Sequence, residues 1–256
     1  MDFSPYFLQL SAGCIGLAPV VPWRAVGKGY HVMMLAIGIA LLVVGRLLGP
    51  PVHPVKGEGP IPLYVLFGVG SSLALGWFLV GSGEPGSWWA RLAAAIGWTA
   101  VFMDGMRAAD VAKGPAAHWA LLAFNFLSGA LLLGSALSAM LLGHWYLVVK
   151  DLPVRPLRTL TILLFVGLGA RLAATVAAFA LDPEGGKAVA DRSFLFVLVY
   201  GLFSLGTPLA MSWMVWGTVK IRSTQAATGI LYGVVVFVLM GEAAGRFVLL
   251  KTGFPL

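Results

Sequence analysis

Glu242 and Arg246 stand four residues apart in the apolar stretch QAATGILYGVVVFVLMGEAAGRFVLL (225–250). In a helix this spacing places both side chains on one face, one turn apart. An ionisable group inside a membrane helix costs roughly 2.5–3.5 kcal/mol on insertion scales, so such groups are usually paired and often functional. The two residues are therefore the first candidates for chemistry in this chain.

The composition of the chain is that of a membrane protein. Of its 256 residues, 59% are hydrophobic and 11% are charged, and the mean hydropathy is +0.92. A soluble domain of this length needs more polar surface. We expect an all-α polytopic membrane protein, with one transmembrane domain over 1–256. Eight apolar stretches reach or approach the ~20 residues that a membrane helix needs: 4–22, 30–49, 62–82, 88–106, 117–148, 157–181, 193–218 and 225–250.

Several classes of function do not fit this sequence. The net charge of +7 comes without a basic run, so no nucleic-acid partner is expected. Cys14 is the only cysteine, which excludes an internal disulfide and a thiolate-ligated iron–sulfur cluster carried by this chain alone. The start MDFSPYF has no basic n-region, so we expect the first stretch to remain as a span. With no P-loop, GxSxG or HExxH motif, a self-contained aqueous active site is not expected.

The turns between the apolar stretches predict an orientation. With the N-terminus outside, the inside turns carry eight of the 17 lysines and arginines and only Glu84 and Asp151 as acidic residues. This is a small bias of the kind that cytoplasmic turns show. The chain is thus expected in the cell inner membrane, with both termini outside. The inside basic residues are Arg24, Lys28, Arg91, Lys150, Arg155, Arg158, Lys220 and Arg222.

Glycine and proline positions predict where the helices turn, bend and pack. The run GPPVHPVKGEGP (49–60) is typical of a turn, and Pro208 inside the seventh stretch is expected to kink it. Gly241 and Gly245 form a GxxxG pattern, and small residues recur around Gly134 in the fifth stretch. Both patterns predict close helix packing.

The estimated depths of the intramembrane polar groups along their helices place these groups in one leaflet. At ~1.5 Å of rise per residue, Arg171 lies near the middle of its stretch, slightly toward the outside. Asn125, Glu242 and Arg246 lie in the outer halves of theirs. Arg46, Asp104 and Arg107 stand at the outer ends of earlier stretches. We therefore predict an outer-half polar cluster.

Three interpretations of this cluster stay open. In the first, Glu242 pairs with Arg171 or Arg246 and only fixes the helix arrangement. In the second, the groups line a cavity for a quinone headgroup, an anion or a proton-coupled substrate, because two arginines to one carboxylate suit an anionic or carbonyl-bearing ligand. In the third, one of the charges pairs with another subunit.

The histidines allow a haem hypothesis. His31 and His144 both flank inside turns, where one haem b could bridge them, since imidazoles are common axial ligands. Interfacial polar residues are the favoured interpretation. His144 and Tyr146 also belong to the aromatic run HWY, which is typical of an interface anchor. Alternatively, these two side chains form an inner-face headgroup site, with nearby basic residues binding lipid phosphates.

Local strings predict an internal repeat with halves 1–112 and 113–256. VVGRLL and LGARLA surround Arg46 and Arg171, and VFMDGMR corresponds in position to VLMGEAAGR. Duplication would give two tandem four-helix bundles. Such an architecture is similar to the membrane subunits of polysulfide-reductase-type complexes, which exchange electrons with quinone. The similarity is one of span count and topology, and it implies no residue-level correspondence.

The leading hypothesis is an integral membrane subunit of a multi-subunit respiratory or electron-transfer complex. Arg171 and Glu242 would orient or deprotonate a quinone headgroup, with Asn125 and Arg246 as secondary contacts. Other subunits and lipids are the expected partners, and any enzymatic role is that of a subunit in an oxidoreductase complex. The alternatives are a small-solute or ion transporter that uses the same charges, and a structural or assembly subunit.

Overall fold

The computed structural model describes residues 3–49, 63–80, 83–109, 112, 115, 118–149 and 151–256, and every regular element in them is a helix. Residues 50–60 of the expected turn and Lys150 lie outside this description. The long helices are α1 (Ser4–Leu17), α3 (Lys28–Leu48), α4 (Leu63–Val80), α5 (Gly83–Ala108), α6 (Trp119–Val148), α7 (Arg155–Leu181), α10 (Thr207–Lys220) and α11 (Thr224–Thr252). The short ones are the 3-10 helix η1 (Ala18–Val20), α2 (Trp23–Val26), α8 (Pro183–Arg192), α9 (Phe194–Val199) and the π-helix η3 (Tyr200–Gly206).

The all-α class is confirmed, and five helical segments of the described chain are long and apolar enough to cross a membrane. They are α3, α6, α7, the continuous segment Phe194–Lys220 and α11. The expected first span, 4–22, is shorter than predicted, because α1 ends at Leu17 and η1 follows. Fourteen helical residues cover only about 21 Å, against a hydrocarbon core of ~30 Å.

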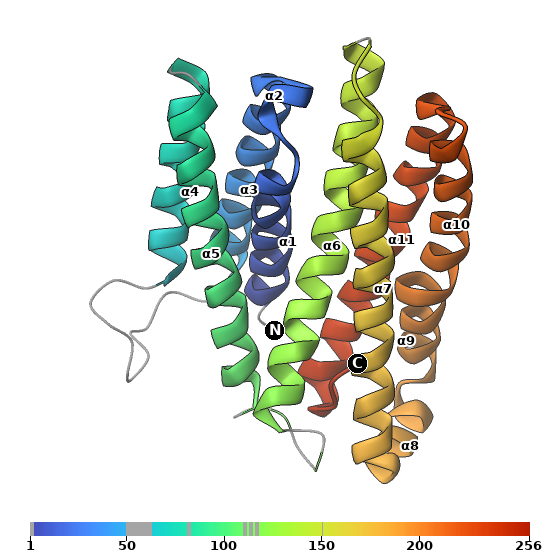
Figure 1. The fold of residues 1–256 in the computed structure, drawn as a ribbon. Coiled ribbons are helices and arrows are strands. Elements are labelled where there is room, and N and C mark those ends of the chain that lie inside the picture. Colours follow the sequence, from blue (N-terminus) through green and yellow to red (C-terminus); the bar gives the residue numbers. More distant parts are fainter. Residues whose placement is uncertain are drawn as a thin grey trace.

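Helix α6 occupies the centre of the molecule. It packs against α1 and α5 on one side and against α7 and α11 on the other. In Figure 1 the helices α1, α3, α4 and α5 lie to one side of α6, whereas α7 to α11 lie to the other. A helix that is surrounded in this way buries most of its side chains, and α6 is the most buried of the five long apolar segments.

Glycine allows α1 and α6 to touch backbone to backbone. A Cβ atom on Gly13 would lie 2.9 Å from Cα of Gly134, closer than real contacts permit. Residues Gln9 to Ile15 of α1 are consequently buried without interruption. The predicted close packing at Gly134 is confirmed, and it brings Gln9 into the interior.

Near Pro208, where a kink is expected, the helix contains the π-helix η3, which ends just before α10 begins. Proline has no N–H to donate to the preceding turn, so regular α-helical hydrogen bonding is interrupted there. The π-helix lies directly on α11, since a Cβ on Gly241 would be 2.6 Å from Cα of Ser204. A Cβ on Gly245 would be 2.9 Å from the Tyr200 ring. The GxxxG prediction is thereby confirmed as a packing surface.

The two ends of the bundle differ in charge. The end with α2 and the α6–α7 turn, at the top of Figure 1, carries Arg24, Arg155, Arg158 and Lys220. The opposite end carries α8, whose PEGGKAVADR sequence mixes acidic and basic residues.

Candidate functional site

A buried polar cluster joins α6, α7 and α11 in the half of the molecule that holds α8 and the two termini (Figure 1). Four of the six predicted site residues meet in it: Asn125, Arg171, Glu242 and Arg246, which are 2%, 2%, 3% and 6% exposed. The sequence placed these groups at similar depth, and the helix packing turns them toward one another. Charged groups so far from solvent must be satisfied by protein partners or by a ligand.

Arg171 donates from each of its three guanidinium nitrogens to a protein oxygen. Nε donates to Glu242 Oε1 at 2.9 Å, and Nη1 donates to the main-chain oxygen of Asn125 at 3.1 Å. Nη2 donates to the main-chain oxygen of Leu256 at 2.7 Å. The side chain is therefore held by three separate segments of the chain.

The residues after α11 fold back into this cluster. Gly253 adopts φ 76° and ends the helix in the left-handed conformation that glycine favours. Leu256 then returns to the interior, where it is 2% exposed. Its main-chain oxygen accepts a second hydrogen bond, from Nδ2 of Asn125 at 2.9 Å. Asn125 and Arg171 thus both fasten the 253–256 segment against α6 and α7.

Glu242 is shared between α7 and η3. Its Oε1 accepts hydrogen bonds from Nε of Arg171 and from the Ser204 hydroxyl. A Cβ at position 129 would lie 3.0 Å from Oε2, so the glycine there leaves room for the carboxylate. The close approach of η3 to Gly241 is what brings the Ser204 hydroxyl within reach.

Arg246 is held differently from Arg171. Its Nη2 donates to Gln9 Oε1 at 2.8 Å, and its guanidinium carbon lies 3.8 Å from the centre of the Phe126 ring. Gln9 in turn donates to the main-chain oxygen of Phe126 at 3.1 Å. Nε of Arg246 is buried and has no hydrogen-bond partner among the described residues. The three charged side chains, Arg171, Glu242 and Arg246, sum to one positive charge.

The four-residue spacing of Glu242 and Arg246 allowed these two residues to pair within α11, but each of them bonds to a different helix instead. Glu242 pairs with Arg171 on α7, whereas Arg246 is bonded to Gln9 on α1. Of the expected outer-end charges, Asp104 and Arg107 pair with each other at 3.6 Å in more exposed positions. Arg46 lies over the Tyr64 ring, 4.9 Å from its centre.

Sequence reasoning missed several members of the cluster. Two of them have a weak signal of buried polar function in the sequence. Gln9 is a polar residue in an apolar stretch, and Ser204 stands shortly before the helix-breaking Pro208. The Tyr200 ring lies 5.4 Å from the Arg171 guanidinium carbon, and its hydroxyl is hydrogen-bonded to Thr175 at 2.7 Å. The main-chain oxygen of Leu256 carries no sequence signal.

His31 and His144 have separate surroundings. Nε2 of His31 lies 3.1 Å and 2.9 Å from the main-chain oxygens of Ala18 and Val21. Because carbonyl oxygens only accept, this nitrogen carries the proton. His144 is exposed, and its Nδ1 is hydrogen-bonded to the Tyr232 hydroxyl at 2.9 Å. Each histidine thus already has a protein partner on one ring nitrogen.

The aromatic run at the end of α6 ties neighbouring segments together. Trp145 Nε1 donates to the main-chain oxygen of Val26 at 2.9 Å. The Tyr146 hydroxyl donates to the main-chain oxygen of Pro153 at 2.8 Å. His144 reaches α11 through Tyr232. Tyr146 therefore holds the α6–α7 turn, and its hydroxyl proton is used within the protein.

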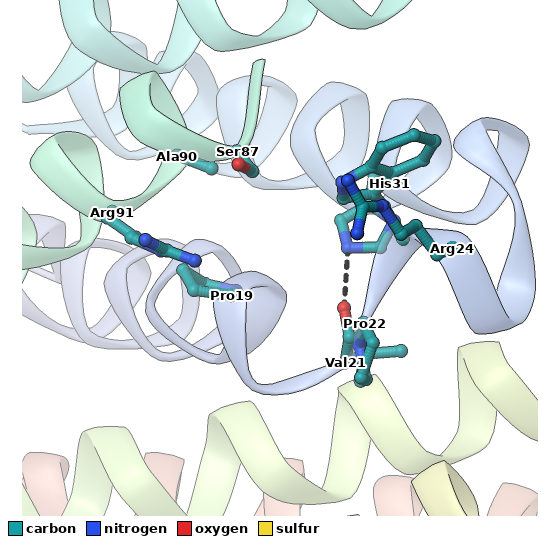
Figure 2. Close-up of a pocket in the computed structure, with 9 residues that line it drawn as sticks. Pro19, Val21, Pro22, Arg24, His31, Ser87, Ala90 and Arg91 are labelled. Atoms are coloured by element: carbon teal, nitrogen blue, oxygen red, sulfur yellow. Dashed lines mark hydrogen bonds between the residues drawn. The ribbon is translucent and has the colours of Figure 1, made fainter. Parts of the chain in front are cut away.

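A pocket of about 350 Å³ opens at the basic end of the bundle, between α2, α3 and α5. Figure 2 shows Arg91 on one side of it and Arg24 with His31 on the other. None of its lining residues is acidic. Nδ1 of His31 is buried without a hydrogen-bond partner among the described residues. This pocket is separate from the buried cluster, with which it shares no residue.

Comparison with protein-family models, with curated proteins and with solved structures finds no match to this chain. Function must accordingly be inferred from the chemistry of the cluster. A guanidinium group that is fully engaged by protein oxygens orients helices. A guanidinium group with a spare buried N–H can also bind a carbonyl or anionic oxygen. The cluster contains one of each kind.

Proposed function

We propose that this chain is a structural membrane subunit of a larger complex, in which Arg171 and Glu242 form a permanent clamp between helices. The observation that carries this proposal is the threefold engagement of Arg171 by oxygens of Glu242, Asn125 and Leu256. A ligand that used the Arg171 guanidinium would first have to displace one of these protein oxygens. A clamp of this kind fixes the outer surface that the protein presents to neighbouring subunits.

The geometry of the ion pair favours a clamp between helices over an ion pair between Glu242 and Arg246 within α11. The ion pair joins α7 to α11, and the hydrogen bonds of the same guanidinium extend to α6 and to the 253–256 segment. Removing one partner of a buried pair typically costs about 3–5 kcal/mol, because the other charge is then left unpaired. The arrangement of three helices thus depends on this one contact set.

A second candidate function is quinone or quinol contact in an electron-transfer complex. It is favoured by Arg246, whose buried Nε has no acceptor among the described residues. A quinone carbonyl is a suitable acceptor for this donor. In this form of the proposal Arg246 contacts the headgroup, whereas Arg171 and Glu242 position the helices. A haem held by His31 and His144 is the less favoured cofactor, since both rings already bond to protein groups.

The proposal includes the topology. The chain would cross the cell inner membrane eight times, with α1 completed by η1 and the following residues, and both termini outside. The basic residues at the end with α2 support this orientation, because cytoplasmic turns are enriched in lysine and arginine. Helices α1, α3, α4 and α5 would form one four-helix set, and α6 would form the other with α7, the segment Phe194–Lys220 and α11, as expected of tandem halves.

Affinity purification in mild detergent, followed by mass spectrometry and a visible spectrum, tests the proposed function. We expect partner subunits to co-purify with the wild type and to be lost with Glu242→Ala. Quinol turnover that falls with Arg246→Gln, while the complex stays assembled, would favour the second candidate. A chain that purifies alone and moves solutes across reconstituted vesicles would overturn both and indicate a transporter.

A further inference from the structure

A second pocket at the basic end, separate from the buried cluster, is lined mostly by cationic residues. It has a volume of about 260 Å³ and lies between the start of α7 and the end of α10. Four of its seven lining residues are basic and none is acidic: Arg155, Arg158, Lys220 and Arg222. Such a concentration of one charge around one cavity calls for an explanation beyond a solvated turn.

None of these four cations forms an ion pair with any residue in the described part of the chain. Arg158 and Lys220 instead share one aromatic ring, lying 5.2 Å and 5.5 Å from the centre of Trp216. Like charges at this proximity repel one another. An anion between them would remove that repulsion and satisfy several donors at once.

The apolar surface next to the pocket identifies the kind of anion. Ile162 lies one turn below Arg158 on α7, and Trp213 lies about one turn below Trp216 on α10. They are 45% and 73% exposed. Phe165 on α7 packs edge-on against Trp216 on α10 with ring centres 6.5 Å apart, so the two helices are in contact beside the pocket. A charged pocket therefore continues directly into an exposed apolar face.

We propose that this pocket binds the phosphate headgroup of an anionic phospholipid, whose acyl chains lie along the exposed faces of α7 and α10. Arg155 and Arg158 supply planar guanidinium groups that match phosphate oxygens, and Lys220 supplies a point charge. Trp216 holds Arg158 and Lys220 in position. The site would tie the α6–α7 turn to the α10–α11 turn through a lipid. It stands independently of the proposed clamp and of any redox role.

Lipid-dependent thermal stability of the purified full chain in detergent tests this site. The probes are phosphatidylglycerol, phosphatidylcholine with the same acyl chains, and inorganic phosphate. We expect phosphatidylglycerol alone to raise the melting temperature of the wild type. Arg158→Gln/Lys220→Gln should weaken the apparent affinity for phosphatidylglycerol about 25-fold, at roughly fivefold for each cation near an anionic headgroup.

Two further variants test whether the response to phosphatidylglycerol arises at this pocket. Arg192→Gln/Lys251→Gln removes two cations from a pocket at the opposite end, where Asp182 also lines the wall, and should leave the response unchanged. Arg158→Lys/Lys220→Arg keeps both charges and should retain most of the response. Equal shifts with phosphatidylglycerol and inorganic phosphate would overturn the lipid assignment. An unchanged response in Arg158→Gln/Lys220→Gln, or an equal response to phosphatidylcholine, would overturn the site.

Discussion

Arg171 donates to oxygens of α6, of α11 and of the residues 253–256 that follow α11. At the scale of single residues, this engagement separates the two arginines of the cluster. Arg171 has each of its nitrogens bonded to protein, whereas one buried N–H of Arg246 has no acceptor in the part of the chain that the structure describes. The same residue type thus performs a holding role in one position and remains able to bind a ligand in the other.

Replacing Glu242 by glutamine should destabilise the protein strongly. The amide keeps the shape of the side chain but leaves the Arg171 charge buried without a counter-ion, at a cost of about 3–5 kcal/mol. The matched control is Asp104→Asn, the same change in the more exposed Asp104–Arg107 pair, where a loss of about 0–1 kcal/mol is expected. Unfolding in detergent measures both variants. Equal losses for the two would contradict the clamp.

At the scale of elements, α11 and η3 form the contact that places Glu242. The π-helix lies on Gly241, and the Ser204 hydroxyl reaches Glu242 from it. Helix α1 contributes Gln9 because Gly13 and Gly134 allow the α1 and α6 backbones to touch. Two polar contacts of the cluster, Ser204 with Glu242 and Gln9 with Arg246, therefore depend on a nearby glycine contact.

Gly241→Ala should lower the free energy of unfolding by about 1–3 kcal/mol, because overpacking forces the backbones apart. Gly229→Ala in the same helix is the control, since a Cβ there meets nothing within 4 Å. That substitution should be neutral or stabilising by up to about 1 kcal/mol, given the higher helix propensity of alanine. If Gly229→Ala were the more damaging of the two, the packing assigned to α11 and η3 would be wrong.

The sequence was informative about elements and about which residues are polar, and less so about how they pair. Helix limits follow from apolar length and from Gly/Pro runs, so α6, α7 and α11 begin and end within two residues of the expected limits. The partner of Glu242 depends on how α7 and α11 are rotated, which one sequence does not encode in a readable pattern. The first span was overestimated because α1, packed inside the bundle, need not be long enough to reach both surfaces.

At the scale of the whole molecule, basic residues gather at one end and the buried cluster lies toward the other. This polarity is what a fixed orientation in a membrane requires. The basic end also carries two pockets whose lining contains arginines and no acidic residue. The proposed lipid site and the proposed clamp would therefore lie in opposite halves of the bundle.

Cysteine labelling in intact cells should report the orientation. The native Cys14 is buried, so the thiol of Glu184→Cys or Lys220→Cys would be the reactive one; both native side chains are exposed. A membrane-impermeant maleimide should label Glu184→Cys in intact cells and Lys220→Cys only after permeabilisation. Labelling in the reverse order would place the basic end outside and contradict the proposed topology.

A double-mutant cycle on Arg171 and Glu242 measures whether the two residues act as one unit. Arg171→Gln, Glu242→Gln and the double variant would be unfolded in the same detergent. We expect each single change to cost about 3–5 kcal/mol, and the double variant to lose little more than one single variant. Losses that add within about 0.5 kcal/mol, as they do for independent residues, would show that no clamp exists between α7 and α11.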